Sequence, residues 1–427
     1  MALFCHIPLN APSLSESVVP YVVRTFLPTS EAAESTVLQK YDIHPHHLLY
    51  FRGMKMTCCA PFVALLTSAV LLTQCQGGGP NVPPPEDATN SDSDSLKYEG
   101  ETHLANLRQL TYGGDNAEAY WAFGGDQLVY QTTQPAAGIP CDRIWIMPLD
   151  TQGSADGHRG PYQVSNGLGR TTCPYFLPGD TAVVFASTHV ADTACPAVPE
   201  RGPEGRYVWP IYDTYDMYIQ NLSTGEMNAI AASDAYDAEA TVSPRGDKMV
   251  FTSTRDGDLD LYTCNLDGSE VHRVTDVLGY DGGAFFSPDG EWLVWRASRP
   301  STPEDIENYK GLLAEGLVEP TAMELFVAKT DGSEMRQVTD LGGANWAPFF
   351  PPDGQRILFS SNHATGRFPF NIYMIDVDGS NLTQITFDEA FDSFPMFSPD
   401  GRHLAFSSNR NNGRTRNTNL FVADWVD

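Results

Sequence analysis

Residues 286–290 read FSPDG, and residues 397–401 repeat the same letters. Looser copies stand at 121–125 (WAFGG), 176–179 (FLPG), 242–246 (VSPRG) and 350–354 (FPPDG). Each copy is followed by an apolar run such as LVWRAS and then by a second run such as LYTCNLDG. Internal repetition at this length predicts a propeller or a solenoid. The repeat assigns residues 101–427 to one array, because propellers are single units despite their size.

The spacing predicts six four-stranded blades. A Thr-like position ends each outer strand, at Thr111, Ser165, Ala231, Thr275, Thr339 and Thr386. The shorter intervals suit four short strands with tight turns, and Asp-Gly pairs such as 267–268 suit a hairpin with φ > 0. The last repeat has only three strands, whereas residues 102–111 (THLANLRQLT) look like an outer strand. We therefore predict an all-β, six-bladed propeller in which this N-terminal strand completes the last blade and removes an exposed edge.

These repeats resemble the TolB-like six-bladed propeller family, whose units are WD40-like, over about residues 98–427. The resemblance implies the fold and says little about function. TolB itself carries an α/β domain before its propeller, and the segment between Cys75 and Glu101 has no sequence that suits such a domain.

Residues 54–75 (MKMTCCAPFVALLTSAVLLTQC) resemble a bacterial lipoprotein signal peptide. Lys55 provides a positive start, the apolar stretch is short for a transmembrane helix, and Cys75 is the residue that such signals lipidate. The alternative is ordinary cleavage near residues 69–77. Because Gln76 rather than Asp follows the cysteine, the resemblance implies an outer-membrane lipoprotein that faces the periplasm or the cell exterior.

The segments on either side of this signal carry no repeat. Residues 1–53 are interpreted as a mis-assigned start or a disordered extension. Residues 76–100 are rich in Gly, Pro, Ser and Asp, which cannot bury a core, so we predict a disordered tether.

The formal net charge of the chain is −28, and all of the acidic excess lies beyond the first 74 residues. Such a domain repels nucleic acid and anionic membrane surfaces. It would attract cations or a basic protein, although solubility alone also explains the charge.

Three long connections, at residues 133–142, 188–213 and 299–321, join second to third strands and so share the face at the mouth of the central channel. The third predicts one short helix, capped by Ser301 or Thr302 and ended by Gly316. It is either a lid or docking helix over the channel, or a helix packed on the propeller to bury its apolar face.

A small polar residue precedes each FSPDG copy at the start of the inner strand. We call these residues the strand-start ring: Asn116, Thr171, Asp237, Asp281, Asn345 and Asp392. Glu118 and Glu239 add carboxylates two positions further on, and we expect all of them at the channel mouth. Carboxylates that converge on one axis suit Ca²⁺, with Asp237, Asp281 and Asp392 as the ligands if a metal binds. The alternative is that each side chain caps the turn into its own strand.

A second, mostly cationic ring ends the second strands: Gln134, His189, Arg255, Arg299, His363 and Arg410. One interpretation is ion pairing with the aspartates between neighbouring blades, which would neutralise the carboxylates. The other is a binding site for an anionic group.

Three cysteines are expected on the mouth face, Cys141, Cys173 and Cys195. In an oxidising compartment one disulfide among them would pin a loop, and the pairing stays open.

Motifs for nucleophilic or metal-assisted catalysis, such as Gly-x-Ser-x-Gly or His-Glu-x-x-His, do not occur in the chain. The first hypothesis is therefore a tethered, non-enzymatic module that binds an envelope protein, a peptide or a glycan, with no cofactor except possible Ca²⁺. The alternative is a cation-dependent hydrolase or lyase with its site at the channel mouth.

Overall fold

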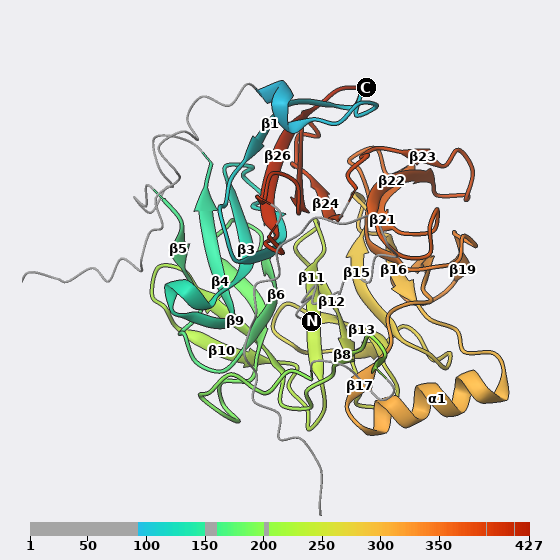
Figure 1. Cartoon of the computed structure of the whole chain (residues 1–427). Coiled ribbons are helices and arrows are strands. Elements are labelled where there is room, and N and C mark those ends of the chain that lie inside the picture. The colour runs from blue at the N-terminus through green and yellow to red at the C-terminus, as the bar shows by residue number, and fades with distance from the viewer. Residues whose placement is uncertain (1–92, 150–159, 200–204, 390, 414) are drawn as a thin grey trace, which may run out of the picture. The chain divides into compact units, whose positions relative to one another are not determined.

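The computed structural model describes residues 93–149, 160–199, 205–389, 391–413 and 415–427. They form six four-stranded antiparallel sheets around a central axis (Figure 1), which confirms the predicted all-β, six-bladed propeller. Residues 1–53, the signal at 54–75 with Cys75, and most of the predicted tether lie outside the described residues. In the described ranges no helix has the length and apolar character that spanning a membrane requires.

Each of the first five blades takes its four strands in chain order. Blade 1 consists of β2 (Asp115–Trp121), β3 (Gln127–Gln134), β4 (Ile139–Pro148) and β5 (Tyr162–Gln163), and blade 2 of β6 (Thr171–Phe176), β7 (Ala182–Ser187), β9 (Asp216–Asn221) and β10 (Met227–Ile230). Blade 3 consists of β11 (Asp237–Val242), β12 (Lys248–Ser253), β13 (Asp260–Asn265) and β14 (His272–Arg273). Blade 4 consists of β15 (Asp281–Phe286), β16 (Trp292–Ala297), β18 (Glu324–Lys329) and β19 (Arg336–Gln337), and blade 5 of β20 (Asn345–Phe349), β21 (Arg356–Ser361), β22 (Asn371–Asp376) and β23 (Thr383–Gln384).

Blade 6 is built from both ends of the propeller. Its first three strands are β24 (Asp392–Phe397), β25 (His403–Ser408) and β26 (Asn419–Trp425), and β1 (Leu104–Gln109) pairs antiparallel with β26 as predicted. Arg410 stabilises this ring closure through two ion pairs. Its Nη2 lies 2.9 Å from the carboxylate of Glu101, which precedes β1, and 2.8 Å from that of Asp392 on β24.

The repeated residues have local structural roles. In five blades the hydroxyl at the Thr-like position accepts a hydrogen bond from a backbone N–H of the third strand, as Thr275 does from Leu261 at 2.9 Å. In the FSPDG turn the Ser287 hydroxyl bonds to Asp289 and accepts from the Trp292 N–H, and Gly290 adopts φ = +69°. Aromatic side chains such as Trp295, Phe251 and Phe406 are fully buried around these turns and strands.

Every inner strand also contains a bulge. The register with the second strand shifts at the same place in all six blades. The bulged residues have left-handed backbones with φ between +47° and +62°, and we call them the bulge ring: Glu118, Cys173, Glu239, Gly283, Ala347 and Phe394. A bulge re-aims the side chain that it carries, so it sets which residues face the channel.

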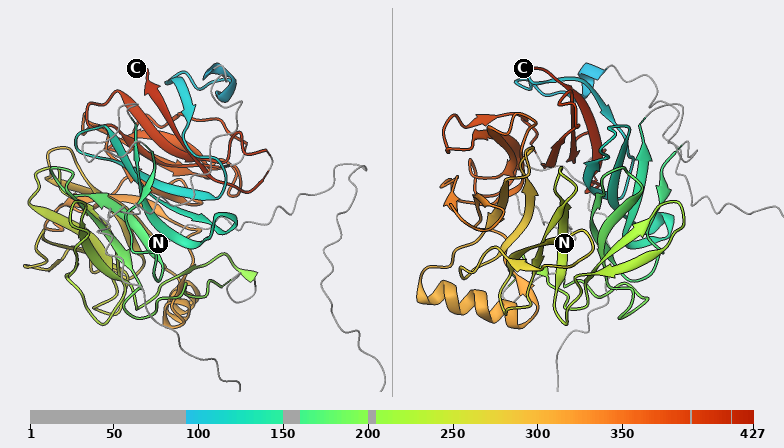
Figure 2. Two further views of the ribbon diagram at one scale, coloured as in Figure 1. Left: turned by 90° about the vertical axis from the view of Figure 1, so that its left-hand side faces the viewer. Right: turned by 180° about the vertical axis from the view of Figure 1, so that it is seen from behind.

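The two longest insertions meet on the mouth face. The helix of blade 4, α1 (Pro303–Ala314), begins with a capping box of Thr302 and Asp305. After it, β17 (Leu317–Val318) pairs with β8 (Trp209–Pro210) from the insertion of blade 2, near α1 in Figure 1 and again in the rear view of Figure 2. The first insertion instead extends β3 and β4 around a short 3₁₀ turn, η3 (Pro135–Ala137). A further 3₁₀ turn, η2 (Ser93–Leu96), precedes β1.

Candidate binding sites in the channel and at its mouth

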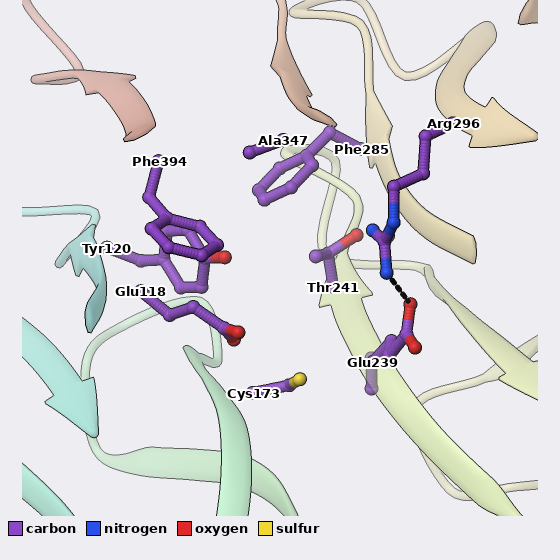
Figure 3. Close-up of a pocket in the computed structure, with 11 residues that line it drawn as sticks. Glu118, Tyr120, Cys173, Glu239, Thr241, Phe285, Arg296, Ala347 and Phe394 are labelled. Atoms are coloured by element: carbon purple, nitrogen blue, oxygen red, sulfur yellow. Dashed lines mark hydrogen bonds and ion pairs between the residues drawn. The ribbon is translucent and has the colours of Figure 1, made fainter. Parts of the chain in front are cut away.

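The bulge ring lines a cavity on the channel axis. All six of its residues border the cavity, together with Tyr120, Thr241, Phe285 and Arg296. Figure 3 shows Glu118 and Cys173 pointing into the cavity from one side, and Glu239 on the other side, where Arg296 reaches its carboxylate. The cavity therefore carries two carboxylates and one guanidinium.

Glu239 is fully engaged by its neighbours. The hydroxyls of Tyr236 and Tyr280 donate to Oε1 at 3.0 and 2.6 Å, and Arg296 Nη2 lies 3.0 Å from Oε2. Burial alone would raise the pKa of Glu239, but Arg296 and the two tyrosine hydroxyls outweigh it and hold the pKa below its ordinary value. Glu239 is thus an ionised and compensated carboxylate.

Gly283 gives Arg296 its path into the cavity. A Cβ on Gly283 would lie 1.7 Å from Arg296 Nη1, so any side chain at this bulge would expel the guanidinium. The backbone of Gly283 is also left-handed, at φ = +61°, which glycine adopts without strain. Because the other five bulges carry side chains at similar φ, the space taken by Arg296 is the stronger reason for glycine at this position.

Glu118 lies in the same cavity but in a different electrostatic setting. Its side chain is buried, and burial raises its pKa to about 7, with Glu239 adding to the shift and the Cys173 thiol and Arg296 opposing it. None of the ion pairs of the described residues includes Glu118. The cavity therefore has one carboxylate more than the arginine compensates.

Aromatic side chains bound the cavity along the axis. Tyr120 of blade 1 contacts Phe285 of blade 4 across the channel, at 5.4 Å between ring centroids, and Tyr175 packs against both. On the mouth side, Trp209 of β8 lies with its ring 5.5 Å from the Arg296 guanidinium and is also buried. The cavity thus has an aromatic floor and a tryptophan above its guanidinium.

The strand-start ring does not line this cavity. Asp237, Asp281 and Asp392 are fully buried and paired with Arg255, Arg299 and Arg410 at 2.6–2.8 Å. Burial raises the pKa of Asp281 to about 7 and that of Asp392 to about 6, against the opposing effect of their arginines. The expectation of pairing between neighbouring blades is wrong, since each of these pairs joins the first and second strands of one blade.

The uncharged members of the two rings also bond to nearby strands. Asn116 donates to Thr418 O at 3.0 Å, Thr171 donates to Asp142 O at 2.9 Å, and Asn345 donates to Met323 O at 2.8 Å, so each bonds to the preceding blade.

The two histidines of the cationic ring, His189 and His363, bond through Nδ1 to Ser187 and Ser361, and partial burial lowers the pKa of both imidazoles. These contacts connect strands and blades.

The structure joins Cys141 of β4 to Cys195 in the insertion of blade 2, with 6.0 Å between the Cα atoms. Cys173 and Cys264 lie outside this disulfide and are buried. Among the described residues, no group of three or more His, Cys, Asp or Glu side chains could hold a metal ion.

The insertions also frame a groove of about 960 Å³ at the mouth. It is lined by Ile211 and Tyr212 from the insertion of blade 2 and by Lys310 and Leu313 from α1. The Tyr309 hydroxyl of α1 donates to Asp258 of blade 3, and Leu312 is buried, so the helix is anchored on the propeller while its other side borders the groove.

Sequence reasoning missed Arg296, Tyr236 and Tyr280 as residues of the channel. The sequence did contain a signal for Arg296, because the equivalent second-strand position in the other five blades carries an uncharged residue. These residues are Gln131, Ala186, Thr252, Ser360 and Ser407. An arginine within an otherwise apolar strand marks a blade that has departed from the repeat.

The six blades form a closed ring around an axial cavity, which defines the chain as a β-propeller. The family model described as the TolB beta propeller domain matches residues 195–309 and 316–417, together about half of the chain. The chain therefore belongs to the TolB β-propeller family, whose fold suits a binding module.

Similar solved structures include the putative TolB from Agrobacterium tumefaciens, with 16% identity and a TM-score of 0.46, covering 74% of this chain and 91% of that chain. TolB from Acinetobacter baumannii has 18% identity and a TM-score of 0.47, with coverage of 70% and 63%. An oligogalacturonate lyase from Vibrio parahaemolyticus has 13% identity and a TM-score of 0.46, with coverage of 74% and 93%. No curated protein matches the sequence.

Proposed function

We propose that this chain is a tethered binding module of the cell envelope that holds a protein or peptide on the mouth face of its propeller. The observation that carries the proposal is the groove between the insertions of blades 2 and 4. Residues shared by every blade build the propeller, whereas this groove exists only because two blades each gained a segment. Segments added to a rigid scaffold are where binding residues concentrate.

The groove combines the surface types that peptide recognition uses. Tyr212 and Leu313 offer aromatic and aliphatic contact, and Lys310 and Glu315 place opposite charges along the same edge. Apolar anchors flanked by charged groups provide affinity and orientation together. The disulfide at Cys195 and the anchored helix α1 hold the insertions in place, which lowers the ordering cost of binding.

The proposed tether comes from the sequence. The lipoprotein-like signal at residues 54–75, Cys75 and the polar stretch after it would attach the propeller to the outer membrane, facing the periplasm or the cell exterior. Expression in a Gram-negative host with a clickable palmitate analogue tests this. Wild type should carry the label in the membrane fraction, and Cys75→Ser should lose it, whereas equal labelling of the two would refute the anchor.

Site-specific photo-crosslinking in the source cells tests the binding face. A photoreactive residue at exposed Lys310, in the groove, should give a discrete crosslinked protein or peptide band. The matched control is Asp289, exposed in the FSPDG turn at the other end of its blade. Crosslinks from position 289 without any from position 310 would place the ligand on the wrong face and overturn the proposal. Loss of the band after glycosidase treatment would indicate a glycan.

A further inference from the structure

The channel cavity differs from the rest of the propeller, because the side chains of its bulge ring are not repeated from blade to blade. The strand-start ring carries Asn, Thr or Asp in every blade and serves the strands. The bulge ring carries Glu, Cys, Glu, Gly, Ala and Phe at six equivalent backbone positions. A propeller needs the bulge but not this set of side chains, so the variation is best explained by something that the cavity holds.

The charges of the cavity indicate that it suits a positively charged ligand. Arg296 and two tyrosine hydroxyls already occupy both oxygens of Glu239. Glu118 is only 4% exposed, points into the cavity, and has the Cys173 thiol, a weak donor, as its hydrogen-bonding neighbour among the described residues. Among the described residues, Arg296 is the positive charge that acts on Glu118, and its guanidinium is paired with Glu239, so a positively charged ligand would stabilise the buried Glu118 carboxylate.

The walls favour an organic cation over a metal ion. Ca²⁺ takes six to eight oxygen ligands, and the described residues offer no cluster of three or more suitable side chains. Tyr120, Phe285 and Phe394 instead line the same cavity as the Glu118 carboxylate with aromatic rings. Aromatic faces beside a carboxylate suit an ammonium group, which donates hydrogen bonds to the oxygens and contacts the rings by cation–π attraction.

We propose that this cavity binds a primary ammonium group, with Glu118 as its counterion and Tyr120 and Phe394 as its aromatic walls. The group belongs either to a free small amine or to the amino terminus or lysine of a bound peptide. On the mouth side the ring of Trp209 lies 5.5 Å from the Arg296 guanidinium. Its strand β8 pairs with β17 through two residue pairs, so a shift of this short ribbon would widen access without opening a blade. The inference does not depend on the groove.

Calorimetric titration of the full chain with ethylamine, putrescine and a short peptide amide tests the proposal, with the N-acetylated peptide as the uncharged comparison. Wild type should bind at least one amine, and Glu118→Gln should weaken that binding by at least about tenfold, as loss of a buried charge-assisted hydrogen bond implies. The matched control Glu270→Gln, at an exposed glutamate, should bind like wild type. Binding of amines but not of either peptide would identify a small-molecule site, and preference for the free peptide would identify a peptide terminus.

Proton release gives a second readout that needs no variant. Because the pKa of Glu118 is about 7, an ammonium ligand should displace its proton at pH 6.5–7, and the apparent enthalpy should then vary with the ionisation enthalpy of the buffer. Failure of every amine to bind at millimolar concentration, or equal binding by wild type and Glu118→Gln, would overturn the inference. The crosslinking result at position 310 would be unaffected by either outcome.

Discussion

Arg296 of β16 and Glu239 of β11 form a buried ion pair of 3.0 Å that joins blade 4 to blade 3. The two residues are 57 positions apart in the chain. The pair exists because blade 4 has glycine at its bulge, where the other five blades have a side chain. It determines the charge of the channel cavity.

Gly283→Ala should lower the free energy of unfolding by about 3–5 kcal/mol, because expelling Arg296 leaves Glu239 buried without its cation. Urea denaturation measures this. Gly366→Ala is the control, since it also has a left-handed backbone but open space around an added Cβ, and it should cost only about 1 kcal/mol. Equal losses in both variants would mean that backbone strain, not the ion pair, dominates.

Arg410→Met should destabilise the closure of blade 6 by about 3–5 kcal/mol, because Glu101 and Asp392 would both remain buried without a cation. Hydrogen exchange should show early opening of β1 and β26. Arg402→Met is the matched control, as its pair with Asp400 is largely exposed, and it should change stability by less than about 1 kcal/mol. Unchanged protection of β1 in Arg410→Met would contradict this role.

Removal of the disulfide with Cys141→Ser and Cys195→Ser should cost about 2–4 kcal/mol, because the bond closes a long segment between blades 1 and 2. Reductant should lower the Tm of wild type to that of the double variant and leave the variant unaffected. A wild-type Tm that ignores reductant would argue against a formed disulfide.

Chelation should not destabilise the propeller. The three aspartates proposed as Ca²⁺ ligands on sequence grounds each have an arginine partner within 2.8 Å. We expect no measurable change in Tm with EDTA or with added Ca²⁺, and metal analysis of the purified chain should find no stoichiometric ion. A chelator-sensitive Tm would contradict this prediction and support the cation-dependent alternative.

The stability of wild type relative to Glu118→Gln should depend on pH. The pKa of Glu118 is raised from 4.5 to about 7 in the folded chain, so the folded state holds an extra proton between these values. That contribution is complete below pH 4.5 and is lost as the pH rises through about 7, with a total change of up to about 3 kcal/mol. Urea midpoints of both proteins from pH 4.5 to pH 8 measure it, and parallel curves would show that Glu118 does not titrate in this range.

Several features followed from local sequence alone. Three of them involve partners only a few residues or one strand away: the turn of FSPDG, the Thr-like hydroxyls, and a cap on α1 by Ser301 or Thr302, of which the structure uses Thr302. Repeated six times, these signals predict the blade count, and the incomplete last repeat predicts that β1 closes the ring. The pairing of Cys141 with Cys195 lay beyond such reasoning, because three cysteines were expected on one face.

The sequence by itself thus determined the propeller, because each blade is specified by contacts within and beside its own repeat. Only the tertiary structure decided which residues meet on the axis. The bulge in each inner strand turns Glu118 and Glu239 into the channel and leaves Asp237 inside its blade, although the sequence pattern predicted all three at the channel mouth. The geometry of a bulge depends on the register between two strands. The Arg296–Glu239 pair depends on the close approach of two blades. Neither can be predicted from a local sequence pattern.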